Sequence, residues 1–344
     1  MTALDEPPRR SRDRVRRLPL LRGVRDALRR HPRATAIGFS VVAAAILVAV
    51  LYGRRDEFAT ALTRASIPVL LLATLLQISA LLSRTEAWHR TIEAAGGTVP
   101  RRALYQASSM GYVSSIVSSQ LGAAARIAAL RRSSPATSPK ATTLVAAEMP
   151  IMAIEVGLAA IASFTVMGPM GWPWWLPFPI MAVTALAAAG LRRLGHRSPR
   201  PLWQGLAVLG RLRPFLFVLF FVLGAVLSQI ARNWLLLNAV GVSASPLDAT
   251  AVLIAMVLLS LLPVGPSAGA GAVVLILGQN GVAAAAAAGL LATVTGTVGG
   301  LAFAGWAAGD HLWGLRRLRG GEGSSAAGGR RPPSEGPRPR PGGD

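Results

Sequence analysis

Charged side chains inside long apolar stretches are the residues of this sequence that could do chemistry. Glu148 and Glu155 lie seven residues apart in the apolar stretch 141–166, so they share one face of a helix. A charge at the centre of a membrane helix costs about 2.5–3.5 kcal/mol, so each one needs an explanation. The two carboxylates are either a site for a lipid headgroup or a proton, or polar contacts inside a helix bundle with Arg126 or Arg232 as partners.

Arg232 and Asn233 form a second candidate site in the apolar stretch 214–240. A guanidinium binds anionic oxygens through two parallel hydrogen bonds, so this pair could coordinate a phosphate. The favoured alternative is that Arg232 snorkels toward the membrane interface. Arg126 lies at the end of a more polar segment, the half-apolar stretch 103–126. It follows Gly122 by one helical turn.

Pro263 and Pro266 interrupt the segment 249–279, with Gly265 between them and Gly269 and Gly271 after them. The segment lacks the Gly-Lys-Ser/Thr sequence that closes a nucleotide-binding loop, which argues against a nucleotide site. Its free backbone amides could instead face an anionic group, and a plain interruption of a helix explains the sequence equally well.

Several kinds of chemistry have no support in the residues. The sequence contains no cysteine, which excludes disulfides, thiolate nucleophiles and Cys-bearing metal centres. Its four histidines are scattered, so we expect neither a metal site nor a cofactor. A Gly-x-Ser-x-Gly motif is absent as well, and we expect no enzymatic activity.

The composition indicates a membrane protein. Hydrophobic residues make up 52% of the 344 residues and charged residues only 15%, although the net charge is +21. The basic residues gather in alternate connections: eleven lie in the first 34 residues, and eight, six and seven lie in 84–140, in 191–213 and after Trp313. This is the positive-inside pattern, so the charge predicts topology and not nucleic-acid binding.

The apolar stretches predict an all-α polytopic membrane helix bundle. Six of them are long enough to cross a bilayer: 35–52, 67–82, 141–166, 172–191, 214–240 and 282–308. The broken segments 103–126 and 249–279 are too polar or too short for simple crossings, which favours two re-entrant helices. Trp88 and Ile92 suggest a short interfacial helix after the second crossing, and Pro173 suits the start of the fourth crossing.

Six crossings place both termini and every Arg-rich connection in the cytoplasm. The two broken segments then enter from opposite sides, an inverted arrangement that transporters use around a substrate site. We expect three regions: an Arg-rich tail (1–34), a membrane domain (35–313) and a disordered Gly/Pro/Arg-rich tail (314–344) with no soluble catalytic domain.

The layout over about residues 70–309 resembles the transmembrane region of the lysylphosphatidylglycerol synthase family, a flippase-like domain. The matching residues are Trp88, Thr91-Ile92, Gly96, Gly122, Arg126, Glu148, Leu262-Pro263, Pro266 and Gly281-Val282. The chain departs from the family pattern at several charged positions. The family usually has an arginine near Thr293, for example, whereas no charged residue lies between Ala249 and Gly309.

The resemblance implies a bacterial inner-membrane protein that moves a phospholipid or a lipid-linked anion between leaflets without covalent chemistry. Membrane lipids with anionic headgroups are then its partners. A homo-oligomer is possible, and the resemblance does not decide the oligomeric state. The alternative is a non-transporting scaffold or accessory subunit. We expect Gly122, Arg126, Glu148, Pro263 and Pro266 to line the path, with Glu155 and Arg232 as further candidates. Arg126 should matter more than Arg232.

Overall fold

The computed structural model describes residues 52, 54–117, 119–133, 140–197, 208, 211–260, 267–277 and 281–327. These residues form eleven helices and no strand. The all-α fold class is therefore confirmed for the described part of the chain. The predicted first crossing, 35–52, lies outside it except for its last residue, as do the ends 1–34 and 328–344.

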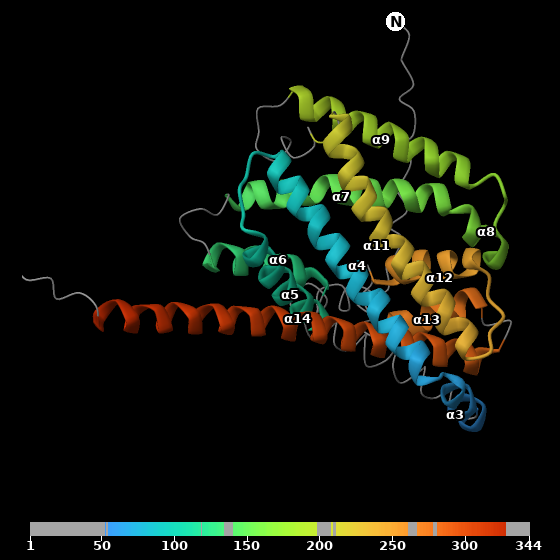
Figure 1. Cartoon of the computed structure of the whole chain (residues 1–344). Helices are drawn as coiled ribbons and strands as arrows, with labels where there is room; N and C mark the ends of the chain where they lie inside the picture. Colours follow the sequence, from blue (N-terminus) through green and yellow to red (C-terminus); the bar gives the residue numbers. More distant parts are fainter. Residues whose placement is uncertain are drawn as a thin grey trace, which may run out of the picture.

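Four helices are long and apolar enough to cross a bilayer. They are α4 (Ile67–Ala94), α7 (Ala141–Ala162), α11 (Leu212–Ala239) and the apolar part of α14 (Val282–Ala327), which ends at Ala307. About 20 residues of helix span the hydrocarbon core, so these helices match four of the crossings predicted from the sequence. In Figure 1, α4 and α11 lie side by side and run in opposite directions.

The fourth predicted crossing begins later than the sequence suggested. A short helix, α8 (Phe164–Met170), follows α7, and α9 (Pro177–Arg197) begins only after the turns of residues 171–176. Pro173 therefore does not start the helix, and the apolar part of α9 is only Pro177–Gly190. The three tryptophans of these turns are exposed, Trp174 at 78%.

The polar segment after the second crossing does not form a separate interfacial helix. Helix α4 continues through it without a break, because no glycine or internal proline interrupts residues 69–94. Trp88 and Ile92 are fully buried, so they are core residues and not interfacial ones. The helix ends at Ala94, and Gly96 follows with a φ of +83°, which favours glycine, while the Gly97 amide donates to the Ile92 carbonyl.

Two helical hairpins lie at opposite ends of the bundle. Helices α5 (Arg101–Val117) and α6 (Ser119–Ser133) pack on each other where α4 ends and α7 begins, and α12 (Pro246–Ser260) and α13 (Ser267–Leu277) do so where α11 ends and α14 begins (Figure 1). Both α5 and α13 pack against α14. The breaks of the two hairpins, at Ser118 and at Pro263 and Pro266, lie outside the described residues.

The apolar side chains form two separate cores. One joins the ends of α11 and α14 to the second hairpin, through residues such as Leu236, Val273 and Leu291. The other joins α4, α5 and α7 through residues such as Trp88 and Leu144. Several buried polar side chains belong to neither core, and they form the candidate site.

Candidate functional site

Arg126 of α6 and Glu148 of α7 form an ion pair. Both side chains are largely buried, with 13% and 15% of their surface exposed. The Arg126 guanidinium also lies over the ring of Trp88, 4.0 Å from the ring centre, where the π-electrons attract a cation. The sequence proposed Arg126 as a partner for the two membrane glutamates, and the structure pairs it with Glu148.

Two glycines bring α5 and α6 close enough to position Arg126. A Cβ atom on Gly122 would lie 2.8 Å from the Cβ of Ser115, and one on Gly111 would lie 2.8 Å from the Cβ of Arg126. Any larger residue at either position would push the two helices apart. Gly122 therefore sits in a helix contact one turn before Arg126, where it fixes the geometry of the hairpin.

Glu155, the second membrane glutamate, pairs with Arg84 of α4. The two guanidinium nitrogens lie 2.5 and 3.2 Å from the two carboxylate oxygens, a bidentate arrangement. This pair is more open than the first, with 45% of Arg84 and 29% of Glu155 exposed. The sequence reasoning missed this partner because it counted Arg84 among the charges of a connection, whereas the residue lies within α4.

Glu86 organises a further charged cluster near the end of α4. Its carboxylate lies 3.0 Å from Arg101 and 3.3 Å from Arg90, and 3.6 Å from the imidazole of His89. The cluster joins the end of α4 to the start of α5. It contains both signs of charge, so the basic residues there have acidic partners close by.

Arg232 of α11 is buried among neutral polar groups. Its side chain is 6% exposed, and its guanidinium donates to Gln77 Oε1 of α4 and to Asn233 Oδ1, 3.4 Å away. Gln77 Oε1 also accepts a hydrogen bond of 2.8 Å from Gln229. Within the described part of the chain, the Arg232 Nε atom is buried without a hydrogen-bond partner, as is the Nε atom of Arg126. The snorkelling interpretation is therefore wrong, because polar groups inside the bundle hold the guanidinium there.

Tyr112 of α5 and the glycines of α14 complete this cluster. The Tyr112 hydroxyl donates to the Gly296 carbonyl over 2.8 Å, and a Cβ on Gly300 would overlap the Tyr112 ring. A Cβ on Gly296 would lie 3.3 Å from Arg232 Nη1. The glycines of α14 thus allow a close contact between α14 and α5. The prediction from sequence missed Gln77 and Tyr112. Gln77 is marked in the sequence only as a polar residue in an apolar stretch, and Tyr112 lies in a half-apolar segment that does not single it out.

One face of α4 connects three of these polar sites. Gln77 contacts Arg232, Arg84 pairs with Glu155, and Trp88 stacks on Arg126. The spacings of seven and four residues place them on one stripe of the helix. At 1.5 Å per residue the stripe is about 16 Å long, roughly half the thickness of a bilayer core.

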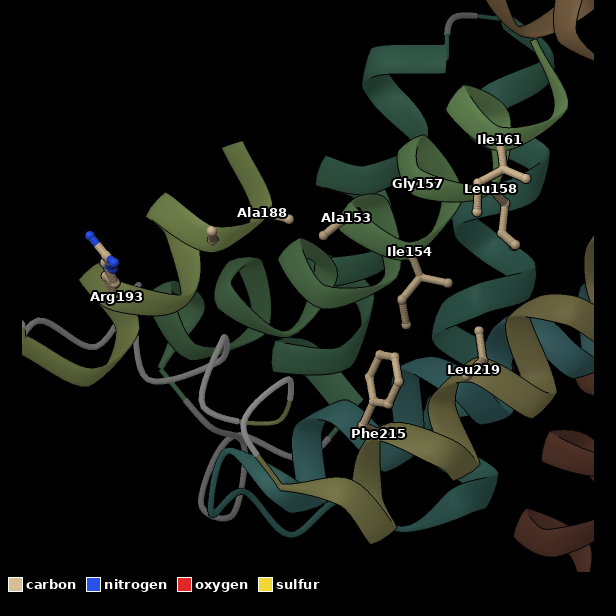
Figure 2. Close-up of a pocket in the computed structure, with 10 residues that line it drawn as sticks. Ala153, Ile154, Gly157, Leu158, Ile161, Ala188, Arg193, Phe215 and Leu219 are labelled. Carbon is tan, nitrogen blue, oxygen red and sulfur yellow. The ribbon is translucent and has the colours of Figure 1, made fainter. Parts of the chain in front are cut away.

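An apolar cavity of about 770 Å³ lies between α7, α9 and α11. Figure 2 shows its wall of aliphatic and aromatic side chains, among them Ile154, Leu158, Phe215 and Leu219, with Arg193 at one end. Apart from Arg193, the lining residues carry no charge. The lining residues include no member of the buried polar clusters, so the cavity is distinct from the α4 stripe.

Residues 35–306 match the model of one protein family, the lysylphosphatidylglycerol synthase TM region. The match covers most of the chain. The protein therefore belongs to this family. No curated protein matches the chain.

Family membership and the four candidate spans make the chain a multi-pass membrane protein. The match covers the transmembrane region of the lysylphosphatidylglycerol synthase family, and no catalytic domain is identified. Among the described residues, no group of three or more His, Cys, Asp or Glu residues could hold a metal ion. The predicted path residues Pro263 and Pro266 lie outside that part of the chain.

Proposed function

We propose that this chain moves a phospholipid or another lipid-linked anion between the leaflets of the bacterial inner membrane, without covalent chemistry. The observation that carries the proposal is the polar stripe on α4, which links Gln77, Arg84 and Trp88 to buried charges on α6, α7 and α11. A headgroup crossing a bilayer needs polar contacts at successive depths while its acyl chains stay in lipid. The stripe offers such contacts over about half the hydrocarbon core.

The proposed topology has six crossings and two re-entrant hairpins, with both termini in the cytoplasm. The hairpin α5–α6 then enters from the cytoplasmic side and α12–α13 from the opposite side, and their positions at opposite ends of the bundle support this arrangement (Figure 1). The positive-inside distribution of arginine supports it independently. Such inverted halves are typical of transporters.

Reporter fusions placed after Trp313 test the orientation. Fusions to a reporter that works only in the cytoplasm should be active, and fusions to one that works only outside should be silent. The opposite result would require residues 249–279 to contain a full crossing, and it would refute the six-crossing topology.

A leaflet-resolved assay tests the function. Purified protein is reconstituted into liposomes with fluorescent phosphatidylglycerol, and a membrane-impermeant quencher reports how much lipid reaches the outer leaflet. We expect faster equilibration than in protein-free liposomes. The control is Glu148→Gln with Arg126→Gln, which removes both charges of the buried pair and keeps both side chains polar. Equal rates with and without protein would contradict the proposal.

A non-transporting scaffold or accessory subunit is the second candidate. It is favoured by the sequence between Ala249 and Gly309, which contains no charged residue of either sign, so the second hairpin beyond Asp248 and the apolar part of α14 contain no charged group. A scaffold would leave lipid movement in liposomes unchanged and would copurify with other membrane proteins.

A further inference from the structure

We infer that Arg232 and the polar groups around it form a binding site for the phosphate of a lipid headgroup. The inference rests on the proposed function for the source of the ligand, and on the structure for the site itself. It places ligand binding at Arg232, whereas from the sequence we expected Arg126 to matter more.

Among the described residues, Arg232 has no acidic partner. No Asp or Glu occurs in residues 156–247 or 249–309, and Asp248 accepts hydrogen bonds from the Ser245 backbone amide and hydroxyl. The two membrane glutamates are committed to Arg84 and Arg126. A buried charge without a counter-ion is costly, so the site has a strong preference for an anion.

The hydrogen bonds show where an anionic oxygen would bind. Gln77 Oε1 accepts from both Arg232 Nη1 and Gln229 Nε2, so a single oxygen occupies a position between a cation and an amide donor. A phosphate oxygen makes the same contacts and adds a negative charge. When the Gln77 side chain swings away, a headgroup phosphate replaces its oxygen and also meets the unpartnered Nε of Arg232.

The walls of the site come from four different helices. Gln77 lies on α4, Tyr112 on α5, Arg232 on α11 and Gly296 on α14. A Cβ on Gly296 would meet Arg232 Nη1 at 3.3 Å and the Tyr112 hydroxyl at 4.0 Å, so the missing side chain keeps both groups close to the α14 backbone. Small movements of α14 therefore change access to the guanidinium directly.

Asn233→Asp is the sharpest test of this site. The substitution keeps the shape of the side chain and puts a carboxylate where Asn233 Oδ1 already accepts from Arg232. The protein should stay folded, with an unchanged or higher melting temperature, while the new carboxylate takes the place of the ligand. A purely structural arginine would show the gain in stability without any loss of binding.

Binding is measured on the full chain in detergent by titration with dioctanoyl phosphatidylglycerol, with dioctanoylglycerol and with inorganic phosphate. We expect the phosphate-bearing lipid to bind at least about tenfold more tightly than either of the others. Asn233→Asp and Arg232→Gln should each weaken that binding by about tenfold or more, and Arg232→Lys by less. Arg131→Gln, which removes an exposed charge on α6, is the control and should bind like the wild type.

The failures of the site and of the function are distinguishable. Equal affinity of the wild type, Arg232→Gln and Asn233→Asp for phosphatidylglycerol overturns the site, whatever the transport assay shows. Loss of binding in both variants, combined with no lipid movement by the wild type, leaves the site in place and overturns the transport function. Inorganic phosphate binding as tightly as the lipid would overturn the assignment to a headgroup.

Discussion

The two halves of the bundle each contain a buried guanidinium, and the two are balanced in different ways. Arg126 has a carboxylate partner, Glu148, and an aromatic ring on its other face. Arg232 has neutral amides as partners, and no acidic side chain among the described residues pairs with it. The Nε atoms of both arginines are buried without a hydrogen-bond partner in that part of the chain. The first arrangement is therefore neutral, whereas the second carries a net positive charge. Burial alone therefore does not identify a binding site, and the presence or absence of a counter-ion separates a structural arginine from a candidate ligand site.

The largest expected effect on stability comes from breaking the Arg126–Glu148 pair. Glu148→Gln leaves the Arg126 charge buried without a counter-ion, so the free energy of unfolding should fall by about 3–5 kcal/mol. Denaturant titration in micelles measures it. The double variant Arg126→Met with Glu148→Met removes both charges and should recover most of the loss. A double variant as unstable as Glu148→Gln alone would contradict this account of the pair.

The second-largest expected effect on stability comes from disturbing the close packing around Arg232. In Gly300→Ala the added methyl group overlaps the Tyr112 ring, so overpacking should cost about 1–3 kcal/mol of unfolding free energy. Gly305→Ala is the matched control on the same helix, because no atom lies within 4 Å of its added Cβ. This control should gain about 0.5–1 kcal/mol from helix propensity. Equal effects of the two changes would show that α14 does not pack tightly against Tyr112.

A smaller effect is expected at the Arg84–Glu155 pair. With 45% and 29% of their side chains exposed, both groups keep much of their hydration when the partner is lost. Arg84→Gln should therefore cost no more than about 1 kcal/mol of unfolding free energy, well below Glu148→Gln. The same denaturant titration compares the two variants. A loss as large as that of Glu148→Gln would mean that the exposure of this pair does not weaken it.

The sequence predicted the elements better than the contacts between them. Length and apolar composition were enough for α4, α7, α11 and α14, because a crossing helix needs about 20 apolar residues whatever its neighbours are. The Arg126–Glu148 pair could also be proposed, since few charges occur in apolar stretches. The start of α9 was wrong, because the sequence gives no signal that separates turns from helix in a tryptophan-rich segment.

The environment of Arg232 could not be derived from the sequence. The partner Gln77 is 155 positions away, and nothing in its own stretch marks it as a partner. Snorkelling was favoured because an isolated arginine in an apolar helix normally reaches for water. The structure overturns that expectation through contacts from three other helices, which only tertiary packing determines. From the sequence we predicted that Arg126 matters more than Arg232. We expect this to hold for stability, and we expect the reverse for ligand binding.

The smallest expected change in stability belongs to Arg232→Met, although this variant should lose phosphate binding. Two contributions to the free energy of unfolding oppose each other in this variant. Removing an uncompensated buried charge is favourable, while Asn233 Oδ1 loses its donor at a cost of about 1–3 kcal/mol. Gln77 Oε1 keeps its 2.8 Å hydrogen bond from Gln229, so it adds little to the cost. The unfolding free energy should therefore stay within about 1 kcal/mol of the wild type.

Arg126→Met is the matched comparison for this last prediction, because it makes the same exchange in the other half. It leaves Glu148 buried without a counter-ion and should cost about 3–5 kcal/mol. The two variants together measure the difference between the regions with one chemical change. If Arg232→Met proves as destabilising as Arg126→Met, both guanidiniums serve the fold, and the absence of a carboxylate beside Arg232 carries no function.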